Sequence, residues 1–251
     1  MDGYGLRLHW HLTADLPATI ANRYVVRTSQ RMKQPSVCFP ALMSPDRSPA
    51  VYRAQALSLA HPDPSQPPLI QGLSFELSPG LSLLRGGDGR GKTRCLGFIA
   101  GRLGAPLSGQ IECSLAPEDI FFEDPTDPAL DAQRASAWLA ALRQGHAGWR
   151  ADLEPPLVEG FALAPHLDKP FYMLSAGSRR KLGLLAAAVC GARLTLLDTP
   201  FAALDGRSIR LLGELLQEAA AQRDRAWLLA DYERPACLHG VDLQAEIDLG
   251  D

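Results

Sequence analysis

The amino-acid sequence predicts an α/β fold, and three observations carry this prediction. A short apolar strand, a glycine-rich loop and an amphipathic helix follow one another over residues 81–103. A second apolar run, residues 194–197, ends in Asp198 and has the length of a buried strand. Two alternating segments, residues 52–59 and 69–77, precede the loop. Strands that alternate with helices indicate an α/β core, and the two leading segments add an antiparallel part.

The glycine-rich loop has the sequence Gly-Gly-Asp-Gly-Arg-Gly-Lys-Thr and fits the pattern G-x-x-x-x-G-K-[ST]. Glycines allow the backbone N–H groups to point inward around a phosphate, and the following helix adds the positive end of its dipole. Lys92 brings a charge to the outer phosphates, and Thr93 offers a hydroxyl to Mg²⁺. The alternative is a glycine-rich turn without a ligand. The residues predicted to contact the nucleotide here are Gly86, Gly87, Asp88, Gly89, Arg90, Gly91, Lys92, Thr93 and Arg94.

Asp198 is the second predicted magnesium ligand. It stands at the carboxyl end of the apolar strand that begins at Leu194. A carboxylate at this position, beside a phosphate-binding loop, typically holds Mg²⁺ together with the loop hydroxyl of Thr93. The alternative is a capping residue for the segment that follows.

Composition excludes several classes of protein. The net charge is −3, so the chain shows no basic footprint for nucleic acid. Its five cysteines lack C-x-x-C spacing, which argues against a disulfide framework or a zinc site and suits a reducing cytoplasm. No apolar run reaches the roughly 20 residues of a membrane span, and the N-terminus lacks a signal-peptide core. A membrane function would therefore require a partner.

Residues 1–50 are expected to form a poorly ordered or accessory extension, and residues 51–251 the main domain. The extension is mildly basic and contains several prolines, and residues 6–12 alternate as a strand does. A docking or targeting role is the functional alternative. A further hypothesis is that translation begins at Met43.

Periodicity predicts the remaining elements. Helical patterns cover residues 94–103, 132–142, 157–163, 182–190 and 209–221. Further strands are expected at residues 81–84, 111–115, 119–122 and 226–230, with a closing pair over residues 238–249.

The order of four motifs resembles the nucleotide-binding subunit of ABC (ATP-binding cassette) transporters, from about Tyr52 to the end. Residues 83–93 resemble the Walker A motif, and Leu174 to Ser178, LSAGS, resembles the signature LSGGQ. Residues 194–198 match Walker B, and residues 203–205 match the D-loop. The LSAG spelling followed by basic residues is similar to the haem-exporter subunit of cytochrome c biogenesis.

This resemblance implies a P-loop NTPase of ABC type. Its mainly parallel sheet would be flanked by helices, with an antiparallel β subdomain at about 51–80 and a small helical subdomain at about 125–175. The chain would be cytoplasmic, held at the inner face of the cell membrane by a multi-span permease. Two nucleotide-binding domains, in a homodimer or heterodimer, would sandwich two ATP molecules with Mg²⁺. His61 would stack on adenine, and the signature of the other chain would face the γ-phosphate through Ser175, Ala176, Gly177 and Ser178.

Three positions depart from the family pattern. Thr199 stands where the family has a catalytic Glu, and Asp231 where it has a switch His. The family's Q-loop Gln aligns with Glu123 or Asp124, and Glu123 is a candidate for sensing magnesium. Threonine cannot accept a proton from the attacking water near neutral pH, so general-base help of about 10²–10⁴-fold would be lost. We therefore expect tight ATP binding by Lys92 and its loop with slow hydrolysis.

Three functions are consistent with this pattern. The first is an energy-coupling ATPase subunit of a transporter. The second is a switch or assembly factor that binds ATP, hydrolyses it little and has no transport role. The third is a soluble ABC-type protein that acts on DNA or ribosomes, which the absence of a basic stripe disfavours. The residues do not specify the cargo or the direction of transport.

Overall fold

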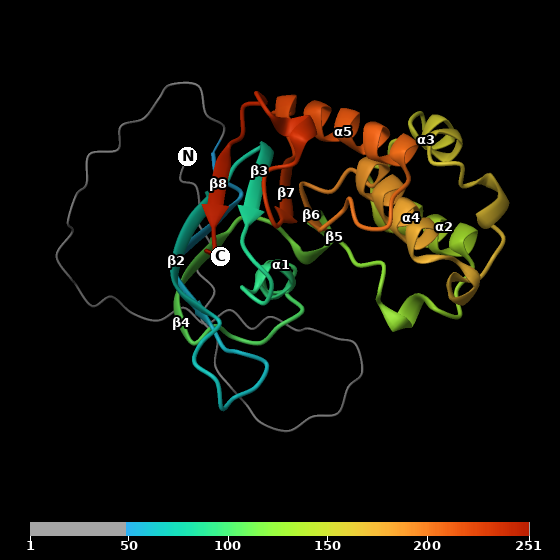
Figure 1. Ribbon diagram of the computed structural model, residues 1–251. Helices are drawn as coiled ribbons and strands as arrows, with labels where there is room; N and C mark the ends of the chain where they lie inside the picture. Colours follow the sequence, from blue (N-terminus) through green and yellow to red (C-terminus); the bar gives the residue numbers. More distant parts are fainter. Residues whose placement is uncertain (1–48, 251) are drawn as a thin grey trace. The chain divides into compact units, whose positions relative to one another are not determined.

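The computed structural model describes residues 49–250 (Figure 1). The predictions for residues 1–48, including the strand at 6–12 and the start at Met43, lie outside the described residues. The strands are β1 (Tyr52–Leu59), β2 (Ile70–Leu77), β3 (Gly80–Arg85), β4 (Ser108–Cys113), β5 (Ile120–Glu123), β6 (Leu194–Asp198), β7 (Ala226–Asp231) and β8 (Ala245–Asp248). The α-helices are α1 (Lys92–Ile99), α2 (Ala135–Gly145), α3 (Glu154–Gly160), α4 (Ala176–Val189) and α5 (Gly206–Ala221).

The main sheet contains five strands in the order β5-β6-β7-β3-β8, and every neighbouring pair is parallel. Its three central strands, apart from their last residues, are buried and mostly apolar, as expected for a parallel sheet covered on both faces. The predicted fold class, a P-loop α/β fold with a mainly parallel sheet, is confirmed.

A second sheet has the order β2-β1-β4 and is antiparallel. Tyr52 pairs with Leu77 on one side and with Cys113 on the other. Arg53 joins all three strands through ion pairs to Glu76 (2.7 Å) and Glu112 (3.0 Å). The third strand, β4, comes from beyond α1, so this sheet extends past the range 51–80 that the sequence suggested.

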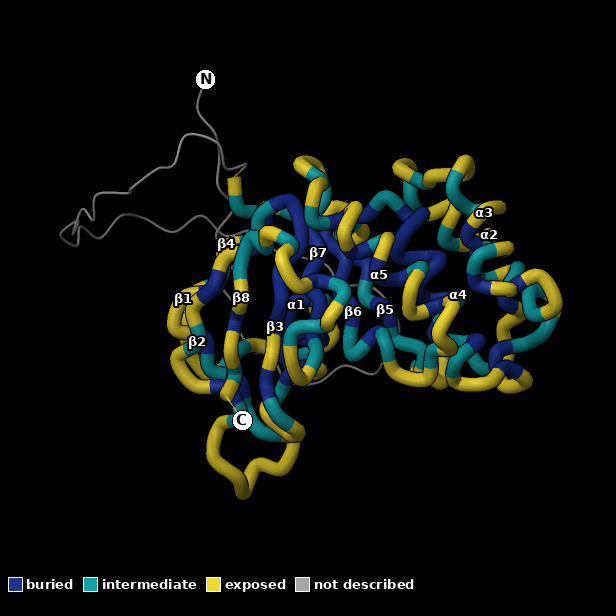
Figure 2. The backbone as a smooth tube through the Cα atoms, turned by 45° about the horizontal axis from the view of Figure 1, so that its top comes forward, coloured by how far each residue is buried: buried dark blue, intermediate teal, exposed yellow. Residues whose placement is uncertain are grey.

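Two hydrophobic cores lie against the two faces of the main sheet. Successive residues of a strand point to opposite faces, so Leu83 belongs to the core with α4 and α5, and Leu84 to the core with α1 and the antiparallel sheet. The same division separates Leu229 from Leu228 in β7. Figure 2 shows the resulting band of buried backbone through β3, β6 and β7. The central strands are therefore held firmly from both sides.

Helical turns fill the stretch between β5 and α4, where α2, α3 and short 3₁₀ turns follow one another. Trp138 of α2 packs edge-on against Phe171, with ring centroids 5.3 Å apart. Leu139 and Phe161 are buried in the same core. Within residues 49–250, no helix has the length and apolar character needed to cross a membrane.

The bounds of several predicted elements were wrong, including the helix expected over 182–190, which begins at Ala176. The helix expected over 94–103 begins at Lys92 and ends at Ile99, because Gly101 turns the backbone to φ +71°. The closing strand pair over 238–249 consists of one 3₁₀ turn, at residues 236–238, and one strand, β8. The apolar residues of this stretch are spaced as in strands, but Leu238 fills the core from the turn.

Gly191, between α4 and β6, lies in close contact with the backbone of Gly148. Gly191 has φ +71°, and a Cβ atom at this position would lie 2.2 Å from the carbonyl oxygen of Gly148. Gly101 has the same φ of +71°, but open space surrounds its missing side chain. Gly101 is therefore a matched control for the steric contact at Gly191.

We predict that Gly191→Ala lowers the free energy of unfolding by about 2 kcal/mol more than Gly101→Ala. Both variants place a side chain in the left-handed region, at about 1 kcal/mol, but only Gly191→Ala must also move a backbone carbonyl. Urea denaturation of both variants measures the difference. Equal losses would show that the Gly148 contact imposes no constraint.

Candidate functional site

The site is built where the carboxyl ends of three neighbouring parallel strands meet. Arg85 at the end of β3 pairs with Asp231 at the end of β7, and Asp198 at the end of β6 pairs with Ala230. Strands in register end at the same edge of a sheet, so the loop after β3 lies beside both carboxylates. Ligands of open parallel sheets bind outside this edge.

The phosphate loop follows β3 and ends where α1 begins. Gly91 precedes α1 with φ +95°, and a Cβ at this position would lie 3.0 Å from side-chain carbons of Leu69. Lys92 is 7% exposed, and its Nζ donates to the carbonyl oxygens of Gly86 (2.6 Å) and Gly87 (2.8 Å). The ammonium group thus lies against the loop itself, where a bound phosphate oxygen would take over its hydrogen bonds.

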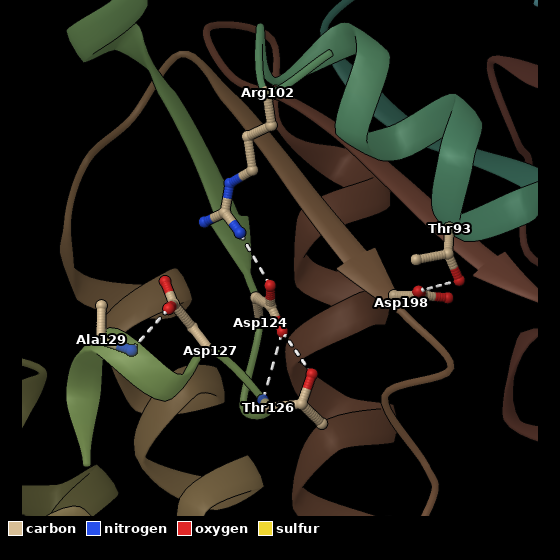
Figure 3. Close-up of polar contacts among 7 residues, drawn as sticks. All are labelled: Thr93, Arg102, Asp124, Thr126, Asp127, Ala129 and Asp198. Carbon is tan, nitrogen blue, oxygen red and sulfur yellow. Dashed lines mark hydrogen bonds and ion pairs between the residues drawn. The ribbon is translucent and has the colours of Figure 1, made fainter. Parts of the chain in front are cut away.

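The structure brings together Thr93 and Asp198, two of the predicted magnesium ligands. The Thr93 hydroxyl donates to a carboxylate oxygen of Asp198 across 2.5 Å, although the residues are 105 positions apart (Figure 3). Oxygen donors of this kind suit Mg²⁺, which keeps several waters and needs few protein ligands. The pair therefore fits an ion held between the loop hydroxyl, the carboxylate and the phosphates.

Thr199 and Asp231 flank this pair. Thr199 has φ +43°, a left-handed conformation that is uncommon for a β-branched residue, and its N–H donates to the carbonyl of Ala230 across 2.8 Å. Asp231 accepts a hydrogen bond of 2.8 Å from the N–H of Tyr232. Burial raises the pKa of Asp231, the nearby Asp198 adds to the rise, and Lys92 opposes it. Neither residue offers the chemistry of the family's Glu and His.

Glu123, the candidate for sensing magnesium, is held by Arg180 in the interior, close enough to Asp198 for their charges to interact. Its side chain is fully buried and forms an ion pair with Arg180, which also donates to the backbone carbonyl of Asp198 (2.9 Å). Burial raises the pKa of Glu123 to about 8, against the opposing effect of Arg180. The other candidate, Asp124, binds Arg102 (2.7 Å) and the Thr126 hydroxyl (2.8 Å), as Figure 3 shows.

The LSAGS segment forms the start of α4. The Ser175 hydroxyl accepts from the N–H of Ser178 (3.1 Å), so Ser175 caps the helix. Gly177 lies under the D-loop, because a Cβ there would be 2.6 Å from the Ala203 carbonyl oxygen. Ala176 is the first helical residue. Within residues 49–250, no hydrogen bond or ion pair links these residues to the chain's own phosphate loop.

His61 follows β1 and is held by a local turn. Its Nδ1 accepts from the N–H of Asp63 across 3.0 Å, which orients the half-buried ring. The segment after it returns to Leu69, which packs against Gly91 at the end of the phosphate loop. The chain thus brings the His61 turn back toward the loop.

Sequence reasoning missed two residues of the site, Arg180 and Tyr232. Arg179, Arg180 and Lys181 are consecutive on a helix, so their side chains point in directions about 100° apart. Arg179 binds Asp131, Lys181 pairs with the D-loop, and only the middle residue turns inward to Glu123. Tyr232 directly follows Asp231 beside the phosphate loop, and that adjacency was a usable signal.

Comparisons with known proteins agree with this geometry. CcmA of Ruegeria pomeroyi, a cytochrome c biogenesis ATP-binding export protein, is 36% identical over 159 residues, covering 62% of this chain and 74% of the relative. CcmA of Rhodopseudomonas palustris is 34% identical over 163 residues, covering 61% of this chain and 79% of the relative. The chain belongs to the ATP-binding subunits of ABC transporters. No family model matches it.

Solved structures of ATP-binding cassettes share the fold of this chain. The ATP-binding subunit of an ABC transporter superposes with a TM-score of 0.63 at 20% identity, covering 72% of this chain and 79% of that one. The ADP conformation of an ATP-binding cassette gives a TM-score of 0.57 at 15% identity, covering 80% and 90%. The sequence relatives confirm the predicted family, and with it an ABC-type ATPase that couples nucleotide binding and hydrolysis to a membrane permease, while the solved structures agree with its fold.

The buried pair of Glu123 and Arg180 gives a test of the site's framework. We predict that Arg180→Met lowers the free energy of unfolding by about 3–5 kcal/mol, because it leaves a buried carboxyl without its partner. Glu123→Gln keeps an acceptor for Arg180 and should cost far less. The double variant Glu123→Leu, Arg180→Met should recover most of the loss. Urea denaturation measures all three, and a double variant no more stable than Arg180→Met would contradict the pairing.

Proposed function

We propose that this chain binds Mg²⁺ and ATP at its phosphate loop and drives an exporter through a membrane permease. The contact of Thr93 with Asp198 carries the proposal, because it brings two oxygen donors of the kind that Mg²⁺ prefers together beside the phosphate loop. In this proposal Lys92 and the backbone N–H groups of residues 86–93 hold the phosphates, Arg94 lies beside them, and His61 stacks on adenine. The ion would screen the phosphate charges and polarise the terminal phosphate.

Export and partners follow from the relatives. Those proteins are described as ATP-binding export proteins of cytochrome c biogenesis, and we extend export to this chain. We propose that two nucleotide-binding domains pair so that Ser175, Gly177 and Ser178 of one reach the γ-phosphate held by the other. Residues 51–251 would form that domain, with a helical subdomain at about 125–175 and residues 1–50 as an accessory extension. The pair would lie at the cytoplasmic face of the membrane.

We further propose that hydrolysis at this chain's own site is slow. Thr199 has no group that takes a proton from water near neutral pH, and Asp231 adds a carboxylate where a neutral or cationic group would stabilise the γ-phosphate. In this proposal, phosphate binding by Lys92 and the loop does not require Thr199 or Asp231. In a heterodimer, the signature of this chain could still serve a faster site on its partner.

The same two residues favour a second candidate, a switch or assembly factor that binds ATP with little hydrolysis and no transport role. The two functions differ in their partner. Co-purification of the full chain with a multi-span membrane protein supports the transporter. Failure to recover the chain with any such protein from detergent-extracted membranes supports the switch.

We predict that Thr199→Glu raises steady-state ATP hydrolysis at least tenfold over the wild type. The carboxylate restores a general base, which contributes about 10²–10⁴-fold where it is well placed. Glutamate also lacks the β-branch that strains Thr199 at φ +43°. Phosphate release, measured beside ATP binding on the same samples, tests this.

Two controls accompany this experiment. Thr199→Gln has the shape of the glutamate without its basicity, so it should stay at the wild-type rate. Lys92→Ala should abolish ATP binding, which ties any activity to this loop. Fast hydrolysis by the wild type, lost in Lys92→Ala, would show that another residue supplies the base.

A further inference from the structure

Tyr232 lies directly over the phosphate loop. The Lys92 ammonium nitrogen is 4.1 Å from the centroid of the Tyr232 ring, a cation–π contact. The Tyr232 hydroxyl donates to a carboxylate oxygen of Asp88 in the same loop, across 2.8 Å. The ring is 52% exposed, so it is held by these polar contacts more than by packing.

The hydroxyl of Tyr232 can donate a hydrogen bond at this place, whereas the ionised carboxylate of the neighbouring Asp231 cannot. The Asp231 carboxylate already accepts the N–H of Tyr232, and an ionised carboxylate can only accept. The hydrogen bond to Asp88 raises the pKa of the Tyr232 hydroxyl, which keeps its proton. A protonated phenol beside a phosphate loop can donate to a phosphate oxygen.

A bound polyphosphate would change the partners of both Lys92 and Tyr232. Lys92 would exchange the carbonyls of Gly86 and Gly87 for outer phosphate oxygens, since a charged acceptor forms the stronger bond. The outer phosphate then lies at the ammonium group that the Tyr232 ring covers. It competes with Asp88 for the hydroxyl, and a terminal phosphate offers more charge and more acceptor oxygens than a carboxylate.

We propose that Tyr232 is a specificity residue for the terminal phosphate, whose hydroxyl passes from Asp88 to the γ-phosphate and selects nucleoside triphosphate over diphosphate. This inference rests on the proposed function, because it requires nucleotide at this loop. Tyr232 thereby supplies the donor that Asp231 lacks. ADP ends one phosphate earlier, so with ADP bound the hydroxyl stays on Asp88.

The test compares ATP and ADP affinities of the full chain and its Tyr232→Phe variant by calorimetry with Mg²⁺, using the β,γ-imido analogue of ATP to prevent turnover. Phenylalanine keeps the ring over Lys92 and removes only the hydroxyl. We expect the affinity for the analogue to fall about 10- to 100-fold, as for a lost hydrogen bond to a charged group, and the affinity for ADP to change less than about twofold. Tyr172→Phe, the same change at a residue that is 65% exposed, should alter neither affinity.

Other outcomes would overturn the inference. Equal losses for both nucleotides would make Tyr232 a general support of the loop. Higher affinity of Tyr232→Phe for both nucleotides would mean that the Tyr232 hydroxyl hinders phosphate binding. If the analogue binds the wild type and Tyr232→Phe leaves the ratio of affinities unchanged, only this inference fails. If the wild type binds no nucleotide, the proposed function fails together with it.

Discussion

The parallel pairing of β3, β6 and β7 is the constraint on which the site depends. This register ends all three strands at one edge, so the phosphate loop, Asp198 and Asp231 meet without any direct connection in sequence. Buried apolar side chains pack against both faces of these strands. The buried Arg180 also donates a hydrogen bond to the backbone carbonyl of Asp198. Precise placement of Thr93 against Asp198 follows from this framework.

Two carboxylates, Asp198 and Asp231, end neighbouring strands at that edge, and Asp88 lies in the loop beside them. The charge of Lys92 stabilises ionised Asp231, and Tyr232 contacts both Lys92 and Asp88 in the loop. A polyphosphate adds further negative charge, so its binding requires compensation by a cation and by donors from the loop. Burial is the main cause of the raised pKa of Asp231, and the charge of Asp198 adds a smaller repulsive contribution. Mg²⁺ at the Thr93–Asp198 pair would relieve this repulsion.

The sequence predicted the parts of this fold that local patterns encode. The phosphate loop and the strand that ends in Asp198 both have short signatures, and each lies where it was expected. The burial of the Glu123 side chain was not predictable. Glu123 and Asp124 are adjacent acids at the end of a strand, and the sequence does not show which of them points into the core. The third antiparallel strand, β4, was recognised as a strand, but its pairing with β1 depends on contacts distant in sequence.

The measurement that tests the central claim most directly is the chemical state of the nucleotide that the protein retains. The wild-type chain is loaded with Mg²⁺ and γ-labelled ATP, freed of excess nucleotide, and sampled over time for ATP, ADP and released phosphate. A site that grips phosphates but lacks a base at Thr199 predicts that the bound nucleotide stays ATP until it dissociates. Rapid conversion to ADP on the isolated chain would contradict the claim.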